Sequence, residues 1–227
     1  MKLNGVLAIR QSWCAPGEPV LVCVPGGRGA MRFDVGGLDW WGKPERGVVG
    51  KVVAGVASVP FALATADDWQ DSATPPNVVV FGPRPDALAM RPWQSLDGSA
   101  QVWCVLTPRR FAWVAAVEES EGPEQEVSLL DQVRGFAKTA KDVLSGKGLY
   151  PAHRPVETVA IRSVGELPRA QIAGIAVAER KLPRKNLTYR DAHVLRVSFV
   201  DGSGVDLLAG PRPDQAHRLL AMANGQG

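Results

Sequence analysis

The chain has 227 residues, of which 45% are apolar, so it is long enough to bury a sizeable core. Its formal charge of +3 excludes the strong basic excess of a dedicated nucleic-acid binder, and we expect no nucleic-acid partner. Cys14, Cys23 and Cys104 form no C-x-x-C pair, and residues 1–10 hold no apolar run long enough for a signal peptide, so we expect a cytoplasmic protein.

The first half of the chain alternates apolar segments with loops rich in glycine and proline. Residues 19–25 predict a first strand, because a short apolar run is followed at once by glycines. Residues 48–66 carry Lys51 as their only charge and predict an apolar helix interrupted at Pro60. Residues 78–81 predict a short buried strand.

The middle of the chain predicts a hairpin followed by a helix. Residues 102–106 and 111–117 are β-type apolar runs, and the Thr-Pro-Arg-Arg sequence at 107–110 is typical of the turn between them. Residues 118–126 are acidic and predict a surface linker. Residues 129–144 place apolar side chains three or four positions apart, which indicates an amphipathic helix.

The last third of the chain is typical of short strands that end in a helix. Residues 156–164 and 172–177 predict two strands. Residues 195–199 alternate apolar and polar side chains, 201–204 supply a hairpin turn, and 205–208 begin the return strand. A terminal helix follows, and we expect its apolar face to bury against the end of the sheets. The residues of that face are Ala216, Leu219, Leu220 and Ala223.

Several of these segments follow one another in a specific order. Gly17-Glu18 precedes an apolar strand, Val105 to Phe111 form a strand-Thr-x-x-Arg-apolar hairpin, and Leu167 to Ile175 contain Pro-x-x-x-Ile. The Asp201-Gly202-Ser203 turn and the last helix complete the pattern. In this order, over about half the chain, they resemble the bacterial pleckstrin-homology-like (PH-like) domains, in which two bent antiparallel sheets are closed at one end by a C-terminal helix.

The resemblance implies an α+β, mainly β fold. It implies bent antiparallel sheets or a partly open barrel capped by the C-terminal helix, with the inserted apolar helix and the amphipathic helix added. Residues 1–227 would form a single PH-like domain with insertions at about 34–99 and 118–155. Many short strands separated by turns independently favour a closed or sandwiched β architecture, because it hides the sheet edges.

Cations gather in residues 179–190, between two of the predicted strands, where Glu179 is the only acid. Because each Lys or Arg near an anionic membrane contributes about 1 kcal/mol, this loop is a candidate for binding lipid headgroups or phosphates. A solvated surface loop is the alternative. The two arginines of the 107–110 turn join the candidate site if both loops lie on the same rim. The candidate ligand-binding residues are Arg180, Lys181, Arg184, Lys185, Arg190, Arg109 and Arg110.

The amino-acid sequence contains no recognisable catalytic or metal-binding motif. His153, His193 and His217 are dispersed and share no ligand spacing with other metal-binding residues. The glycines at 26–29 follow a strand but lack the full dinucleotide fingerprint. We therefore expect no catalytic residue, no metal and no cofactor.

The leading hypothesis is a non-enzymatic, cytoplasmic PH-like binding module that recognises an anionic membrane surface or a phosphate-bearing ligand. Residues 48–66 add a second attachment if they lie in the membrane interface, and a buried helix or a true span are the other interpretations. The alternative is a protein-interaction or assembly scaffold that holds a protein partner or a second copy through exposed apolar surface, including Trp40 and Trp41. A third hypothesis is an enzyme whose catalytic groups converge from distant positions.

Overall fold

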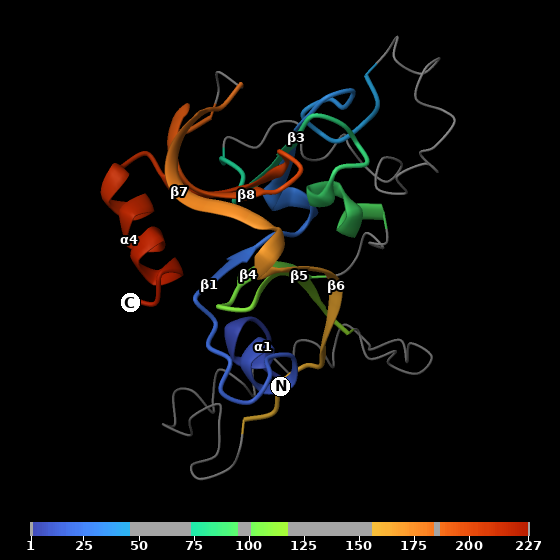
Figure 1. Ribbon diagram of the computed structural model, residues 1–227, viewed down its shortest axis with the longest axis vertical. Helices are drawn as coiled ribbons and strands as arrows, with labels where there is room; N and C mark the ends of the chain where they lie inside the picture. The colour runs from blue at the N-terminus through green and yellow to red at the C-terminus, as the bar shows by residue number, and fades with distance from the viewer. Residues whose placement is uncertain (1, 46–73, 95–100, 118–155, 184–186, 227) are drawn as a thin grey trace, which may run out of the picture.

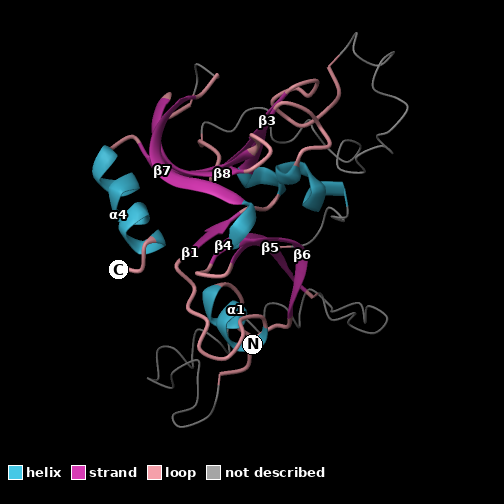
Figure 2. Ribbon diagram, viewed as in Figure 1, coloured by secondary structure: helices cyan, strands magenta, loops and turns pink. Residues whose placement is uncertain are grey.

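The computed structural model describes residues 2–45, 74–94, 101–117, 156–183 and 187–226. Over these ranges the chain forms an α+β, mainly β fold, in which a four-stranded and a five-stranded sheet pack face to face (Figures 1 and 2). In chain order the elements are α1 (Val6–Ser12), β1 (Val22–Pro25), η1 (Arg28–Ala30), β2 (Met31–Val35), β3 (Val78–Gly82), η3 (Leu88–Gln94), β4 (Val102–Leu106), β5 (Arg110–Ala116), β6 (Ile161–Pro168), η4 (Arg169–Gln171), β7 (Ile172–Lys181), β8 (Asp191–Phe199), β9 (Gly204–Gly210) and α4 (Pro213–Ala223).

The two sheets differ in how their strands are connected. The first has the order β1-β4-β5-β6 and is antiparallel throughout. The second has the order β2-β3-β9-β8-β7, and here the expectation of purely antiparallel pairing is wrong for one pair, because β2 and β3 run parallel. Residues 36–77 connect these two strands, and only a connection of about a dozen residues or more allows parallel neighbours. The sheets do not close into a barrel.

The four-stranded sheet is buried on both faces. Its inner face packs against the five-stranded sheet, and its outer face is covered by α1, which buries Ala8 and Ile9 against β4, β5 and β6. All five residues of β4 are buried as a result. This explains why the segment is a continuous apolar run without alternation.

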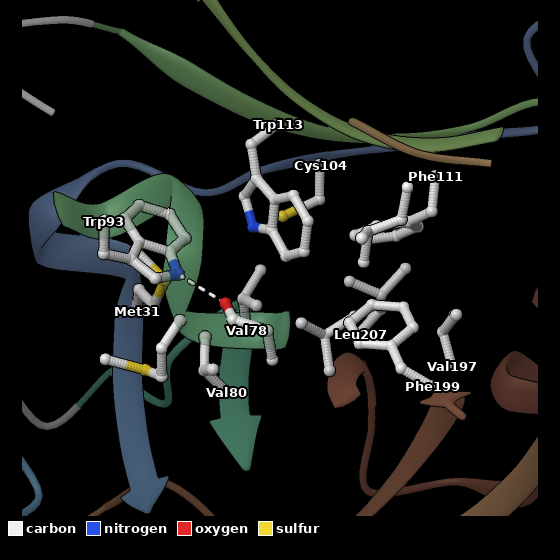
Figure 3. Close-up of a cluster of buried hydrophobic side chains, with 14 of the residues drawn as sticks. Met31, Val78, Val80, Trp93, Cys104, Phe111, Trp113, Val197, Phe199 and Leu207 are labelled. Carbon is white, nitrogen blue, oxygen red and sulfur yellow. Dashed lines mark hydrogen bonds between the residues drawn. The ribbon is translucent and has the colours of Figure 1, made fainter. Parts of the chain in front are cut away.

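The core between the sheets is built around aromatic rings (Figure 3). Trp113 meets Phe111 at 4.8 Å between ring centroids and Trp93 at 6.2 Å, in both cases edge to face. Phe199 and Phe33 extend the cluster toward the five-stranded sheet. Edge-to-face contacts add about 0.5–1.5 kcal/mol per pair to the burial of the rings themselves.

The C-terminal helix closes the sandwich beside β1 and β7, and it also contacts β8 and β9. Ala216 and Ala223 are buried, and Leu219 and Leu220 pack half-buried against the core, so the predicted apolar face is confirmed. Pro213 begins the helix, where its missing N–H is unused in any case.

Two predicted helices, at 48–66 and 129–144, lie outside the described residues. So do the whole segment at 118–155 and residues 46–73 and 95–99 of the segment at 34–99. The later part of that segment contains β3, which lies between β2 and β9. Residues 34–99 therefore supply a strand inside the second sheet.

The tryptophans of the core provide a test of the packing. Trp93 Nε1 donates to the carbonyl of Ala89 at 3.1 Å, whereas the buried Trp113 Nε1 has no hydrogen-bond partner among the described residues (Figure 3). Trp93→Phe should lower the free energy of unfolding more than Trp113→Phe, by about 1 kcal/mol, because only the first change removes a hydrogen bond from the core. Urea unfolding of both variants measures the difference, and equal losses would contradict it.

Candidate functional site

The candidate basic loop forms the end of the β7–β8 hairpin. Glu179, Arg180 and Lys181 belong to β7 and not to a loop, because strand pairing with β8 continues to the Lys181–Asp191 pair. Lys181 is exposed. Arg184 and Lys185 lie outside the described residues.

Two of the candidate cations are bound within the protein. The Arg180 side chain is only 9% exposed, its Nε donates to the Asp206 carboxylate, and its Nη1 donates to Asp34 Oδ2 at 2.8 Å. Arg190 Nε donates to the carbonyl of Leu182 at 3.4 Å. These contacts anchor the base of the hairpin.

Asp206 is the centre of this arrangement, and its side chain is fully buried. Arg196 on β8 holds it side-on, with Nε–Oδ1 at 2.7 Å and Nη2–Oδ2 at 2.8 Å, and the Arg196 guanidinium lies 4.9 Å from the ring centre of Phe81. Hydrogen bonding to Asp206 is the largest cause that raises the pKa of Arg196. Asp34, Arg180, Arg196 and Asp206 are called the Asp206 cluster below.

The Asp206 cluster requires a strongly coiled sheet. Asp34 and Arg180 lie on β2 and β7, which are the opposite edges of the five-stranded sheet, yet their side chains form an ion pair. The edges of a flat five-stranded sheet are about 19 Å apart, too far for this contact. β7 accordingly curves along its length and turns away from the four-stranded sheet (Figure 1).

Apolar side chains fill the concave outer face that the coil creates. Leu182, at the base of the hairpin, is fully buried there with Ala192 and Val194. The partly buried residues packed against them are Trp40, Ala178, Leu187, Tyr189 and Leu208. The hairpin is thus fixed to the sheet by both packing and charge.

Arg109 and Arg110 lie at the other end of β7. Arg110 pairs in the sheet with Pro168, just before β7 begins, whereas Lys181 is the last residue of β7. Ten strand residues separate the two ends by roughly 30 Å along the strand. The structure therefore does not bring the 107–110 turn and the basic hairpin onto one rim.

Arg110 is also occupied internally. Its Nη2 donates to Glu18 Oε2 at 2.9 Å, its Nη1 donates to Glu166 at 2.8 Å, and its guanidinium lies 3.9 Å from the ring centre of Trp13. Thr107 Oγ1 donates to Glu18 Oε1 at 2.7 Å. We refer to Glu18, Thr107, Arg110 and Glu166 as the Glu18 cluster. It joins two of the segments that carried the sequence resemblance, Gly17-Glu18 and Val105 to Phe111.

Trp40 and Trp41 both contact the protein's own chain. Trp40 packs against the apolar cluster around Leu182, and the Arg32 guanidinium lies 4.0 Å from the ring centre of Trp41. Both tryptophans are half-buried.

Groups suited to catalysis or metal binding are dispersed. His193 lies on β8, His217 is exposed on α4, and His153 is outside the described residues. Burial raises the pKa of Cys23 to about 11, and burial with the nearby Glu18 carboxylate raises that of Cys14, so neither thiol is activated. In the described ranges no three His, Cys, Asp or Glu side chains could jointly hold a metal ion.

Among the described helices, none combines the length and apolar character needed to cross a bilayer. Comparison with family models, curated proteins and solved structures finds no match to this chain. Inferences about its function therefore depend on its own residues.

The two acids of the Asp206 cluster should differ sharply in their effect on stability. Asp206→Asn leaves two guanidinium groups beside a buried neutral group and should cost about 3–5 kcal/mol. Asp34→Asn removes a solvent-exposed partner and should cost at most about 1 kcal/mol, because Arg180 retains Asp206. The free energy of unfolding in urea measures both, and similar losses would show that Asp206 does not hold the sheet.

The Glu18 cluster should make the protein sensitive to acid. Burial opposes ionisation of Glu18, but hydrogen bonds from Thr107, the Ala15 N–H and Arg110 lower its pKa below the ordinary value of 4.5. A lowered folded-state pKa stabilises the protein above the unfolded pKa, and this contribution disappears as the pH falls through the folded pKa. Glu18→Gln should therefore be less stable at neutral pH and lose less stability between about pH 5 and 3.

Thermal unfolding across this pH range checks the expectation for Glu18. Glu157→Gln is the matched control, because Glu157 is exposed. If Glu18→Gln and Glu157→Gln show the same acid dependence as the unchanged protein, the Glu18 cluster does not contribute to it.

Proposed function

We propose that this chain is a PH-like binding module, located in the cytoplasm and peripherally associated with membrane, whose β7–β8 hairpin contacts an anionic surface or a phosphate-bearing ligand. Two mainly antiparallel sheets with a C-terminal helix are the arrangement that the sequence resemblance implies. The Glu18 cluster adds support, because residues quoted for that resemblance contact one another.

The proposal rests on a difference among the hairpin cations, because some are bound within the protein and at least one is exposed to solvent. Arg180 and Arg190 are bound to the protein and hold the base of the hairpin, while Lys181 is exposed beside them. Arg184 and Lys185 follow in the sequence without an acidic neighbour. We therefore narrow the candidate ligand-binding residues to Lys181, Arg184 and Lys185.

An anchored hairpin is a better binding element than a free loop. Leu182 is buried under the hairpin, so the backbone beside Lys181 does not have to be ordered when a ligand binds. Binding then costs less conformational entropy. Each exposed cation near an anionic membrane contributes about 1 kcal/mol, so three give a weak, salt-sensitive attachment.

Flotation with phosphatidylglycerol vesicles tests the proposal. The double variant Arg184→Glu, Lys185→Glu should weaken binding by roughly thirtyfold or more, because at least two favourable contributions of about 1 kcal/mol are lost. Raising the salt concentration should weaken binding by the unchanged protein.

The double variant Arg84→Glu, Arg169→Glu is the matched control. It changes the net charge equally and alters two exposed arginines, of which Arg84 follows β3 and Arg169 lies just before β7, at the opposite end of that strand from the hairpin. Equal loss of binding in both double variants would mean that net charge alone attracts the protein. No flotation of the folded protein at low salt would reject the membrane proposal.

A further inference from the structure

We propose that the outer face of the five-stranded sheet carries a separate anion site, in which Arg196 and Arg180 bind a phosphate monoester that takes the place of the Asp34 carboxylate. This site lies on the sheet and does not require the hairpin cations. It therefore goes beyond the membrane contact proposed above.

Arg196 is oriented for a ligand before one binds. Its Nε and Nη2 are engaged by Asp206 and its guanidinium lies over Phe81, so the group is held in one position. Within the described part of the chain, Nη1 has no hydrogen-bond partner given by the structure, and the side chain is 33% exposed. The outer edge of a fixed guanidinium is well suited to a second anion.

Asp34 already shows where an anion can lie. Its carboxylate is 63% exposed and contacts Arg180 Nη1 at 2.8 Å. An exposed ion pair contributes little to stability, so this carboxylate can rotate into water at small cost. Asp206 cannot leave in the same way, because it is buried and accepts hydrogen bonds from both arginines.

The charges of the cluster favour replacement of Asp34 by an anion with more charge and more acceptors. Two arginines and Asp206 leave one positive charge, which Asp34 neutralises with a single contact to Arg180. A phosphate monoester carries up to two negative charges and three strong acceptor oxygens. It can accept from Arg180 Nη1 and from Arg196 at once, which a carboxylate attached to β2 does not do here.

Neighbouring residues strengthen the attraction. Arg32 pairs in register with Val79 on β3, and Val79 pairs with Asp206 on β9, so Arg32 lies in the same row on the same outer face. Counting Arg32, three arginines accompany two aspartates there. The Arg32 guanidinium donates to the carbonyl of Met31 and lies over Trp41, so it adds positive charge to this face and is not itself counted as a ligand contact.

Isothermal titration with glycerol 3-phosphate at low salt tests the site on the full chain. Asp34→Asn should bind about two- to fivefold more tightly than the unchanged protein, because the competing carboxylate is gone. Arg196→Gln should weaken binding at least about tenfold. Arg196→Lys, which keeps the positive charge beside Asp206, should also weaken it, because the planar fork is lost.

Controls separate this site from the hairpin and from misfolding. Arg184→Glu, Lys185→Glu should weaken glycerol 3-phosphate binding far less than Arg196→Gln does, whereas it should weaken flotation strongly. Each variant is first checked by thermal unfolding, and Asp34→Asn remains decisive if the Arg196 variants unfold. The inference is overturned if neither the unchanged protein nor Asp34→Asn binds glycerol 3-phosphate. It is also overturned if Asp34→Asn binds no more tightly than the unchanged protein, or if Arg196→Lys binds as tightly as the unchanged protein.

Phosphatidic acid vesicles distinguish the two sources of a phosphate monoester. If they compete with glycerol 3-phosphate, and Arg196→Gln removes the competition, the site accepts a lipid headgroup. If glycerol 3-phosphate binds and the vesicles do not compete, the natural ligand is a soluble phosphate ester. Both results support the site.

Discussion

One buried carboxylate, that of Asp206, holds the five-stranded sheet in its coiled form. It accepts hydrogen bonds from Arg196 on the neighbouring strand and from Arg180 on the far side of the hairpin. A buried carboxylate is stable only when hydrogen-bond donors surround it. The coil of the sheet brings the Arg180 side chain within hydrogen-bonding distance of Asp206. The same coil brings β7 toward β2, creates the concave face that buries Leu182, and fixes the direction of the hairpin.

On the outer face of each sheet an arginine is bound to a buried carboxylate. Some arginines that the sequence offered as ligand-binding residues are therefore structural. The Glu18 cluster joins the segment before β1 to the β4–β5 turn, as the Asp206 cluster joins β7 to β9. Arg110 and Arg180 are bound to acids in these clusters, and Arg190 donates to a backbone carbonyl. A count of basic residues in a segment therefore overstates the positive charge available to a ligand. An arginine on a strand that binds a buried carboxylate on another strand is already neutralised, as Arg180 is by Asp206.

The sequence allowed much of the fold to be predicted but little of the site. Continuous apolar runs identified β1, β3, β4 and β5, and the hairpin turn at 201–204 located β8 and β9. The pairing of Arg196 with Asp206 did not follow from that turn, because the observed hairpin is centred on Asp201, whereas a turn at 201–204 would pair Arg196 with Ala209. β2 was missed although its sequence carries a strand signal, because Met31, Phe33 and Val35 alternate with polar residues. The Asp34–Arg180 contact could not be predicted from the sequence, because it joins the two edge strands of the sheet. It depends on the coiling that accumulates over the four strand pairs between them.

The difference between Asp34 and Asp206 sets the electrostatic character of the outer face. If both acids were buried, two arginines would be neutralised permanently and the face would be inert toward anions. Because Asp206 alone is buried, one positive charge is retained in a fixed orientation and is compensated only by an acid that water can solvate. The potential of this face therefore depends less on the number of arginines than on the exposure of a single aspartate, which is a property of the coil and not of the composition.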